Sequence, residues 1–414
     1  MSAELIEGAR VILEDRVETA SVRIVDGLIT GIDVARDGAA VIPAKGRILA
    51  PAFVDVHGDA FERQLQPRPG VMVPVDAAML ESDRQLAANG IATAYHALSL
   101  SWEPGLRSVE VGWQVVDALE RLDGRLTTDN RIQLRWETFY PEAEPLIAHV
   151  LQGHARPSLA FNDHTTSSLL HPDVALHDRP FDHVEEYPVT DITSDRFRDK
   201  MGDRAKRSQI STDAYIDLLS RVWSRRSEVP AQIERIAALA RQHGTPMLSH
   251  DDSQVETRDY YRALGARVAE FPMHDRVFLA ARAAGDPIIL GAPNAMRGGS
   301  HLGSPGAAKM VARGLCDILA SDYYYPAMLG AMVRMSADNV APLPVLWNLV
   351  SRNPAEAMGL TDRGRIAPGL RADLVLLDWP DGHAPAPLRT WVAGRGGYSA
   401  IRALPALTAA EPAH

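Results

Sequence analysis

Six polar residues stand where apolar, strand-like runs of the sequence end, and their side chains could hold a metal ion. They are His57, Asp59, Glu137, His164, His250 and Asp322. Imidazole and carboxylate ligands without thiolates suit Zn²⁺, Mn²⁺ or Fe²⁺. We therefore expect a divalent metal cofactor of one or two ions, zinc first, with manganese or iron as the alternatives.

Two of these residues share one strand. Successive side chains of a strand point to opposite faces, so His57 and Asp59 should point to the same side. The competing interpretation is that all six are ordinary buried polar residues. Such residues would scatter along strands and helices, whereas these gather at the ends of strand-like runs.

Each candidate has an expected role in hydrolysis. Glu137 is placed to bridge two ions, and Asp322 is the expected catalytic base that takes a proton from the attacking water. The reaction class that follows is metal-assisted hydrolysis at an electrophilic carbon or phosphorus.

Eight strand-like segments alternate with helical stretches between residues 53 and 322. They cover residues 53–59, 91–98, 132–137, 158–164, 246–252, 267–271, 287–291 and 317–322. This alternation predicts an α/β fold, a (β/α)₈ TIM-like barrel, whose active site lies at the C-terminal ends of its strands.

The two ends of the chain read as short strands and turns. Asp26-Gly27 is a hairpin signal between two such strands. We predict that residues 1–50 and 360–403 form one small β-sandwich domain. The barrel would then span 51–359, followed by a tail at 404–414.

Arginine residues and a glycine-rich segment follow the ends of two predicted strands. The glycine-rich segment 291–301 contains Arg297, Ser300 and His301, and Arg63 and Arg68 follow the first strand. These five residues could bind an anionic substrate, because glycine loops and arginine suit phosphate. The alternative is an ordinary barrel loop that needs glycine for its turns. The basic stretch 196–207 is either a solvated helical face or a lid.

Composition limits the partners. The net charge of −10 argues against nucleic acid but leaves an anionic small molecule open. The sequence shows no membrane-length apolar run and no signal-peptide pattern, and Cys316 reads as a buried structural thiol. We expect a cytoplasmic protein without a membrane partner, and a homodimer is one option.

Several motifs resemble known families. The β unit split between the termini, His57-Gly58-Asp59, the final-strand Asp322 and the return at residues 369–375 resemble the amidohydrolase superfamily. Longer stretches resemble its ribose 1-methylphosphonate 5-triphosphate diphosphatases, of the carbon–phosphorus lyase pathway. These stretches are residues 67–71, 249–252, 269–272, 291–294, 297–301 and 317–324.

The resemblance implies a metal-dependent hydrolase of phosphonate metabolism that converts a ribose 1-phosphonate 5-triphosphate to the 5-phosphate and pyrophosphate. Gly58 stands where those diphosphatases usually have threonine, and residues 165–167 also depart from their pattern. Two alternatives therefore stay open: an amidohydrolase or deaminase acting on a C–N bond, and a non-catalytic scaffold. The superfamily's metal histidines usually follow strands five and six, whereas His164 and His250 follow predicted strands four and five.

Overall fold

Two separate eight-stranded sheets organise the computed structural model, which describes residues 3–153, 156–299, 306–380 and 382–400. The first sheet is parallel throughout, with its strands in chain order. Its strands are β6 (Phe53–Gly58), β7 (Ile91–Leu100), β8 (Asp129–Glu137), β9 (Ser158–Asn162), β10 (Met247–His250), β11 (Ala266–Glu270), β12 (Ile288–Gly291) and β13 (Ile318–Ala320). A parallel bridge between Gly58 and Asp322 joins the first strand to the end of the eighth. The predicted (β/α)₈ barrel is confirmed, including its strand count.

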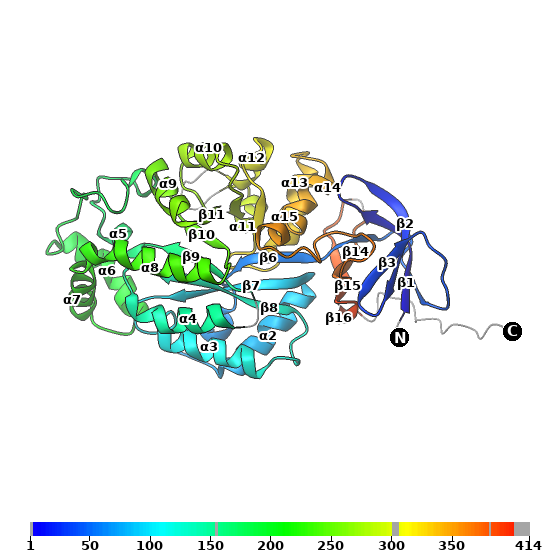
Figure 1. Cartoon of the computed structure of the whole chain (residues 1–414), viewed down its shortest axis with the longest axis horizontal. Coiled ribbons are helices and arrows are strands. Elements are labelled where there is room, and N and C mark those ends of the chain that lie inside the picture. Colours follow the sequence, from blue (N-terminus) through cyan, green and yellow to red (C-terminus); the bar gives the residue numbers. More distant parts are fainter. Residues whose placement is uncertain (1–2, 154–155, 300–305, 381, 401–414) are drawn as a thin grey trace.

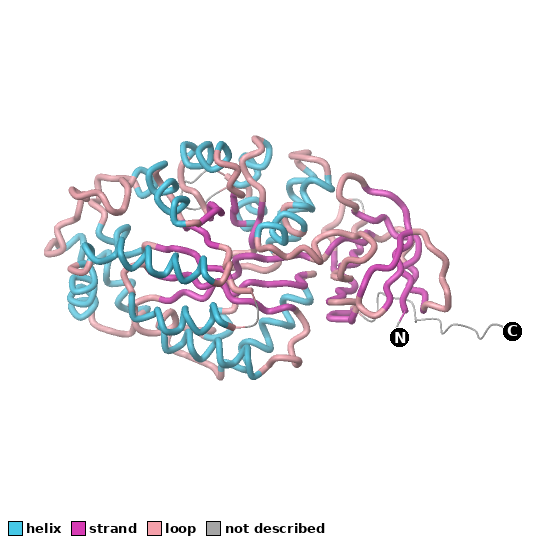
Figure 2. Tube along the Cα trace, viewed as in Figure 1, coloured by secondary structure: helices cyan, strands magenta, loops and turns pink. Residues whose placement is uncertain are grey.

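Helices connect the strands and surround the barrel (Figures 1 and 2). They are α1 (Glu62–Leu65), α2 (Val75–Ala88), α3 (Val109–Arg121), α4 (Glu144–Gln152), α5 (His164–Leu169), α6 (Asp195–Arg207), α7 (Thr212–Trp223), α8 (Val229–Gln242), α9 (Val255–Leu264), α10 (Asp275–Ala283), α11 (Ala292–Arg297), α12 (Ala307–Ala312), α13 (Ala327–Ala337), α14 (Leu343–Asn348) and α15 (Arg352–Ala357). Among these described helices, none combines the length and the apolar character that a membrane crossing requires.

The second sheet unites the two ends of the chain. It contains β1 (Ala3–Ile12), β2 (Val17–Val25), β3 (Leu28–Ile32), β4 (Ala40–Pro43), β5 (Ile48–Pro51), β14 (Leu374–Asp378), β15 (Ala386–Val392) and β16 (Arg395–Ser399). Antiparallel pairing of β5 with β14 joins the N-terminal strands to the C-terminal ones. This sheet has its own apolar core, which includes Ile6, Leu49 and Trp391. The predicted small β domain built from both termini is confirmed, while the predicted tail at 404–414 lies outside the described residues.

The β domain and helices α6 and α7 lie at opposite ends of the long axis of the molecule (Figure 1). Helices α5, α6 and α7 all belong to the long connection after strand β9. The basic stretch of this connection is therefore helical and lies far from the β domain.

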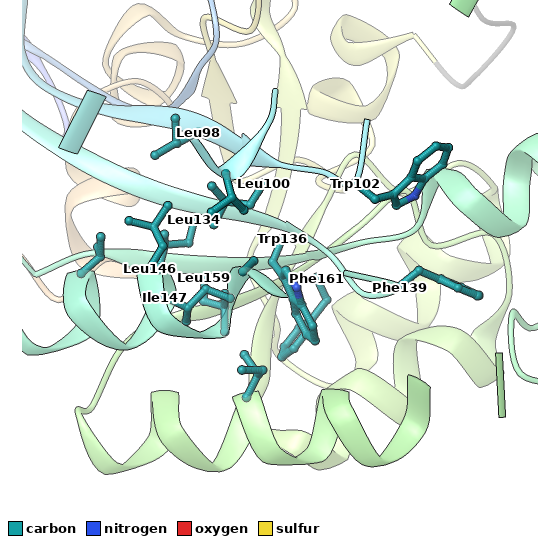
Figure 3. Packing of buried hydrophobic residues seen from close by; sticks show 14 of the residues in the cluster. Leu98, Leu100, Trp102, Leu134, Trp136, Phe139, Leu146, Ile147, Leu159 and Phe161 are labelled. Carbon is teal, nitrogen blue, oxygen red and sulfur yellow. The ribbon is translucent and has the colours of Figure 1, made fainter. Parts of the chain in front are cut away.

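Side chains along β8 point alternately to the apolar core outside the barrel and to the barrel interior. Leu134 and Trp136 belong to the outer core that the surrounding helices cover, and Figure 3 shows them beside side chains of α4 and β9. The intervening residues Gln133, Arg135 and Glu137 must then point into the barrel. All three are buried, so the same strand supplies apolar packing outside and polar chemistry inside.

A buried carboxylate closes the barrel. Asp55 on β6 is fully buried, and its two oxygens accept hydrogen bonds from the backbone N–H of Ser321 at 3.0 Å and from the Ser321 hydroxyl at 2.5 Å. Burial raises the pKa of Asp55, and the bonds from Ser321 oppose this increase. Hydrogen bonds satisfy the buried polar group and fix the first strand against the eighth.

Gly58 packs directly against this closure. A Cβ atom at position 58 would lie 2.7 Å from Asp55 Oδ2, 3.0 Å from Ser321 Oγ and 3.3 Å from a ring carbon of Tyr325. The closure therefore requires a residue without a side chain at this point.

We predict that Gly58→Ala lowers the free energy of unfolding by about 1–3 kcal/mol, because the added methyl group overpacks the closure. Urea unfolding of the two proteins measures the difference. Gly306→Ala is the matched control, since a Cβ atom there meets no atom within 4 Å. Equal losses in both variants would show that the closure is not tightly packed.

Candidate metal centre

The inward-pointing side chains of two barrel strands are apolar in the middle of the barrel and polar at its C-terminal end. Leu248 and Val268 belong to the apolar interior of the barrel, and two residues further along their strands stand His250 and Glu270. Because side chains alternate along a strand, His250 and Glu270 point inward at the C-terminal end of the barrel. This end is where the site was predicted.

His57, His250 and Glu270 form one group that could hold a metal ion. Each offers a ligand atom within 4.8 Å of the others. His57 Nδ1 lies 3.0 Å from Glu270 Oε1, and His250 Nε2 lies 4.0 Å from Glu270 Oε2. Gln133 Nε2 donates to Glu270 Oε1 at 2.7 Å, which fixes the orientation of the carboxylate.

His57 also belongs to a second group, with Asp59 and Asp322, whose ligand atoms lie within the same 4.8 Å limit. The backbone sets this arrangement: Asp322 N donates to His57 O at 2.9 Å, and Asp59 N donates to Asp322 O at 2.9 Å. Barrel closure thus places the last-strand aspartate beside the first-strand motif.

Glu137 and His164 form a pair beside these groups. His164 Nδ1 lies 2.6 Å from Glu137 Oε1, and Asn162 Nδ2 donates to the same oxygen at 2.6 Å. Burial opposes charge on Glu137, but His164 outweighs it and lowers the pKa of Glu137. The His164 and His250 ring centroids are 6.4 Å apart, so the pair adjoins the metal-binding groups.

Three residues that follow barrel strands adopt left-handed backbone conformations. The φ angles are +60° at Asp251, +52° at Phe271 and +56° at Asp322. Side chains other than glycine rarely take this conformation, and it costs about 1–3 kcal/mol per residue. Such strain is common at functional sites, and here it follows strands five, six and eight.

The donors fit a divalent cation. Glu270 Oε2 and His250 Nε2 are buried without a hydrogen-bond partner in the described part of the chain, while His250 Nδ1 lies 3.0 Å from Asp251 Oδ2. Burial lowers the pKa of His250, which favours the neutral imidazole that ligates metals. Buried polar atoms without partners are costly, and a metal ion would satisfy them. Cys316 is a buried free thiol whose Sγ lies 3.3 Å from the Ile318 carbonyl oxygen; the ligand groups contain no thiolate.

The residues predicted to bind substrate lie further out. Arg63, Arg68 and Arg297 are exposed, on α1, the loop after it and the end of α11. Arg63 donates to the backbone carbonyl of Tyr323. Two further predicted residues, Ser300 and His301, lie outside the described residues.

Sequence reasoning left two buried site residues out of the metal and substrate sets. Glu270 was not among the predicted ligands, although the residue ends strand six as His250 ends strand five. Arg135 was not considered, yet it is buried with Nη1 3.9 Å from Asp59 Oδ2. Its position two residues before Glu137 on an alternating strand was the available signal.

We predict that Glu270→Ala weakens divalent metal binding at least tenfold, because it removes one ligand and releases its partner His57. Metal analysis and chelator competition on purified protein measure the effect. His149→Ala is a suitable control, since that exposed imidazole pairs with Glu120 on the outer helices. Unchanged metal affinity in Glu270→Ala would remove Glu270 from the centre.

Sequence comparisons agree with this geometry. The model of the Amidohydrolase family matches residues 200–396. The chain is 30% identical over 385 residues to alpha-D-ribose 1-methylphosphonate 5-triphosphate diphosphatase of Escherichia coli (strain K12), covering 92% of this chain and 96% of the relative. A shorter match, 45% identical over 76 residues, covers 18% of this chain and 13% of the adenine deaminase of Methylobacterium sp. (strain 4-46).

Solved structures share the fold across its full length. Phenylurea hydrolase B superposes with a TM-score of 0.63 at 15% identity, covering 99% of this chain and 100% of that structure. Molinate hydrolase superposes with a TM-score of 0.60 at 13% identity, covering 95% and 94% of the two chains. Together with the full-length E. coli match, these findings establish that the chain belongs to the amidohydrolase superfamily.

Proposed function

We propose that this hydrolase acts in phosphonate metabolism and converts a ribose 1-phosphonate 5-triphosphate to the 5-phosphate and pyrophosphate. The observation that carries the proposal is the 30% identity to the E. coli diphosphatase over 92% of this chain. The alignment spans both the barrel and the β domain, so it includes every strand end that contributes to the metal centre.

The metal centre supports hydrolytic chemistry at phosphorus. His57, His250 and Glu270, with Asp59, would hold the cation, for which we propose zinc, with manganese or iron as alternatives. A divalent ion bound there would act as a Lewis acid on a phosphoryl oxygen and make water a better nucleophile.

Asp322 is the proposed general base. Its backbone is fixed on both sides by the bonds to His57 and Asp59. A Cβ atom added at Gly291 would lie 3.3 Å from Asp322 Oδ2. The absence of a side chain at the end of strand seven therefore leaves room for the Asp322 carboxylate. Asp322 would accept the proton that the attacking water loses.

We predict that Asp322→Asn lowers kcat by about 10²–10⁴-fold, the usual contribution of a general base. Metal content should change little, because His57, His250 and Glu270 still provide ligands. Phosphorus-31 NMR of metal-loaded protein with the ribose triphosphate should show pyrophosphate for the native protein. Absence of pyrophosphate, while the E. coli diphosphatase turns over in parallel, would refute the proposed function; full activity of Asp322→Asn would refute only the role of Asp322.

A second candidate is hydrolysis of a C–N bond in a cyclic amide or an amino-heterocycle. The observation favouring it is the local match to an adenine deaminase, at 45% identity over 76 residues. In this case Glu270 or Asp251 could transfer a proton to the leaving nitrogen. Ammonia release or ring opening across a panel of such compounds, without pyrophosphate from the ribose triphosphate, would select this candidate.

A further inference from the structure

A cavity of about 290 Å³ opens beside the metal centre. Glu137 and His164 line it on the side of the barrel. Arg107, from the connection after β7, and Arg204 and Arg207, from helix α6, line it as well. The cavity therefore reaches from the strand ends to the long connection at residues 164–230.

The three arginines of the cavity differ in how closely carboxylates hold them. Arg107 makes two bonds of 2.9 Å to the two oxygens of Glu62, and Arg204 Nη1 lies 3.8 Å from Glu103 Oε1. For Arg207 no carboxylate lies within 4.0 Å in the described parts of the chain. The cavity lining therefore combines these three arginines with the three glutamates Glu62, Glu103 and Glu137. The guanidinium of Arg207, which no described carboxylate holds, is the one available to phosphate oxygens, which guanidinium groups suit.

The inner end of the cavity contains an unused hydrogen-bonding group. Ser99 lines it, and its buried hydroxyl has no hydrogen-bond partner among the described residues. Ser99 of β7 is paired in register with Arg135 of β8. The buried Nε of Arg135 also has no hydrogen-bond partner among the described residues. Buried polar groups are usually hydrogen-bonded, so the Ser99 hydroxyl is available to donate to a ligand in the cavity, whereas Arg135 is not part of the cavity lining.

We propose that this cavity binds a condensed phosphate, the terminal diphosphate of the substrate that leaves in the reaction. The inference rests on the proposed function and specifies which residues recognise the substrate. Ligand pockets measure about 300–1,000 Å³, and this cavity of about 290 Å³ lies at the small end of that range, which leaves room for a condensed phosphate.

The proposed reaction assigns the cavity a role in the bond changes. Water adds to the phosphorus nearest the ribose and gives one proton to Asp322. The bond from that phosphorus to its bridging oxygen breaks, and the oxygen leaves with the electron pair as part of pyrophosphate. Arg107, Arg204 and Arg207 would stabilise the charge that develops on this leaving group.

The test uses inorganic pyrophosphate as the probe. Isothermal titration calorimetry with metal-loaded protein should show binding that Arg204→Ala combined with Arg207→Ala weakens at least tenfold. Lys206→Ala is the matched control: Lys206 lies between the two arginines, is exposed, pairs with Asp203 at 3.4 Å and does not line the cavity. Its affinity should stay within twofold of the native value, and it controls for chelation of the metal by pyrophosphate.

The outcomes separate this inference from the proposed function. Equal pyrophosphate affinity in the double variant and in Lys206→Ala overturns the inference, even if the native protein hydrolyses the ribose triphosphate. Arginine-dependent pyrophosphate binding without turnover supports the cavity and refutes the proposed reaction. If Arg204→Ala fails to fold, Arg207→Ala alone decides, because Arg207 is exposed and its truncation removes little packing.

Discussion

The contact between the Asp55 carboxylate and Ser321 holds the first barrel strand against the eighth, and the arrangement of His57, Asp59 and Asp322 depends on it. A parallel eight-stranded sheet that stayed open would leave its first and last strands on distant edges. Here the buried carboxylate and the backbone bonds around Asp322 close the sheet. The metal-ligating motif of strand one and the proposed base of strand eight consequently become neighbours, although about 265 residues of sequence separate them.

The periodic features of the chain could be predicted from sequence because they are local. Strand-like runs separated by helical stretches indicated the barrel and its strand order, and His57 and His250 were recognisable because each ends such a run. Both lie in the metal-binding groups. The predicted strand count is also correct: the histidines do follow strands four and five, and strand six contributes Glu270 instead.

The remaining part of the site depends on tertiary arrangement. The spacing of Arg135 from Glu137 indicates that both point to the same side of their strand, but only the pairing of β7 with β8 shows that Arg135 lies beside Ser99. Helix α6 has a strongly charged sequence that fits a solvated surface equally well. Its return to the strand ends, where Arg204 and Arg207 line the cavity, depends on the path of the whole connection after β9, which no local pattern encodes.

Gly58 has a consequence for how this chain diverged from similar enzymes. The diphosphatases that the sequence resembles usually have threonine at this position, whereas here Asp55, Ser321 and Tyr325 occupy the space a side chain would need. A change between glycine and threonine therefore requires compensating substitutions or shifts in these neighbours. The residues should covary among homologues, and exchanging position 58 alone between two such enzymes should impair both of them.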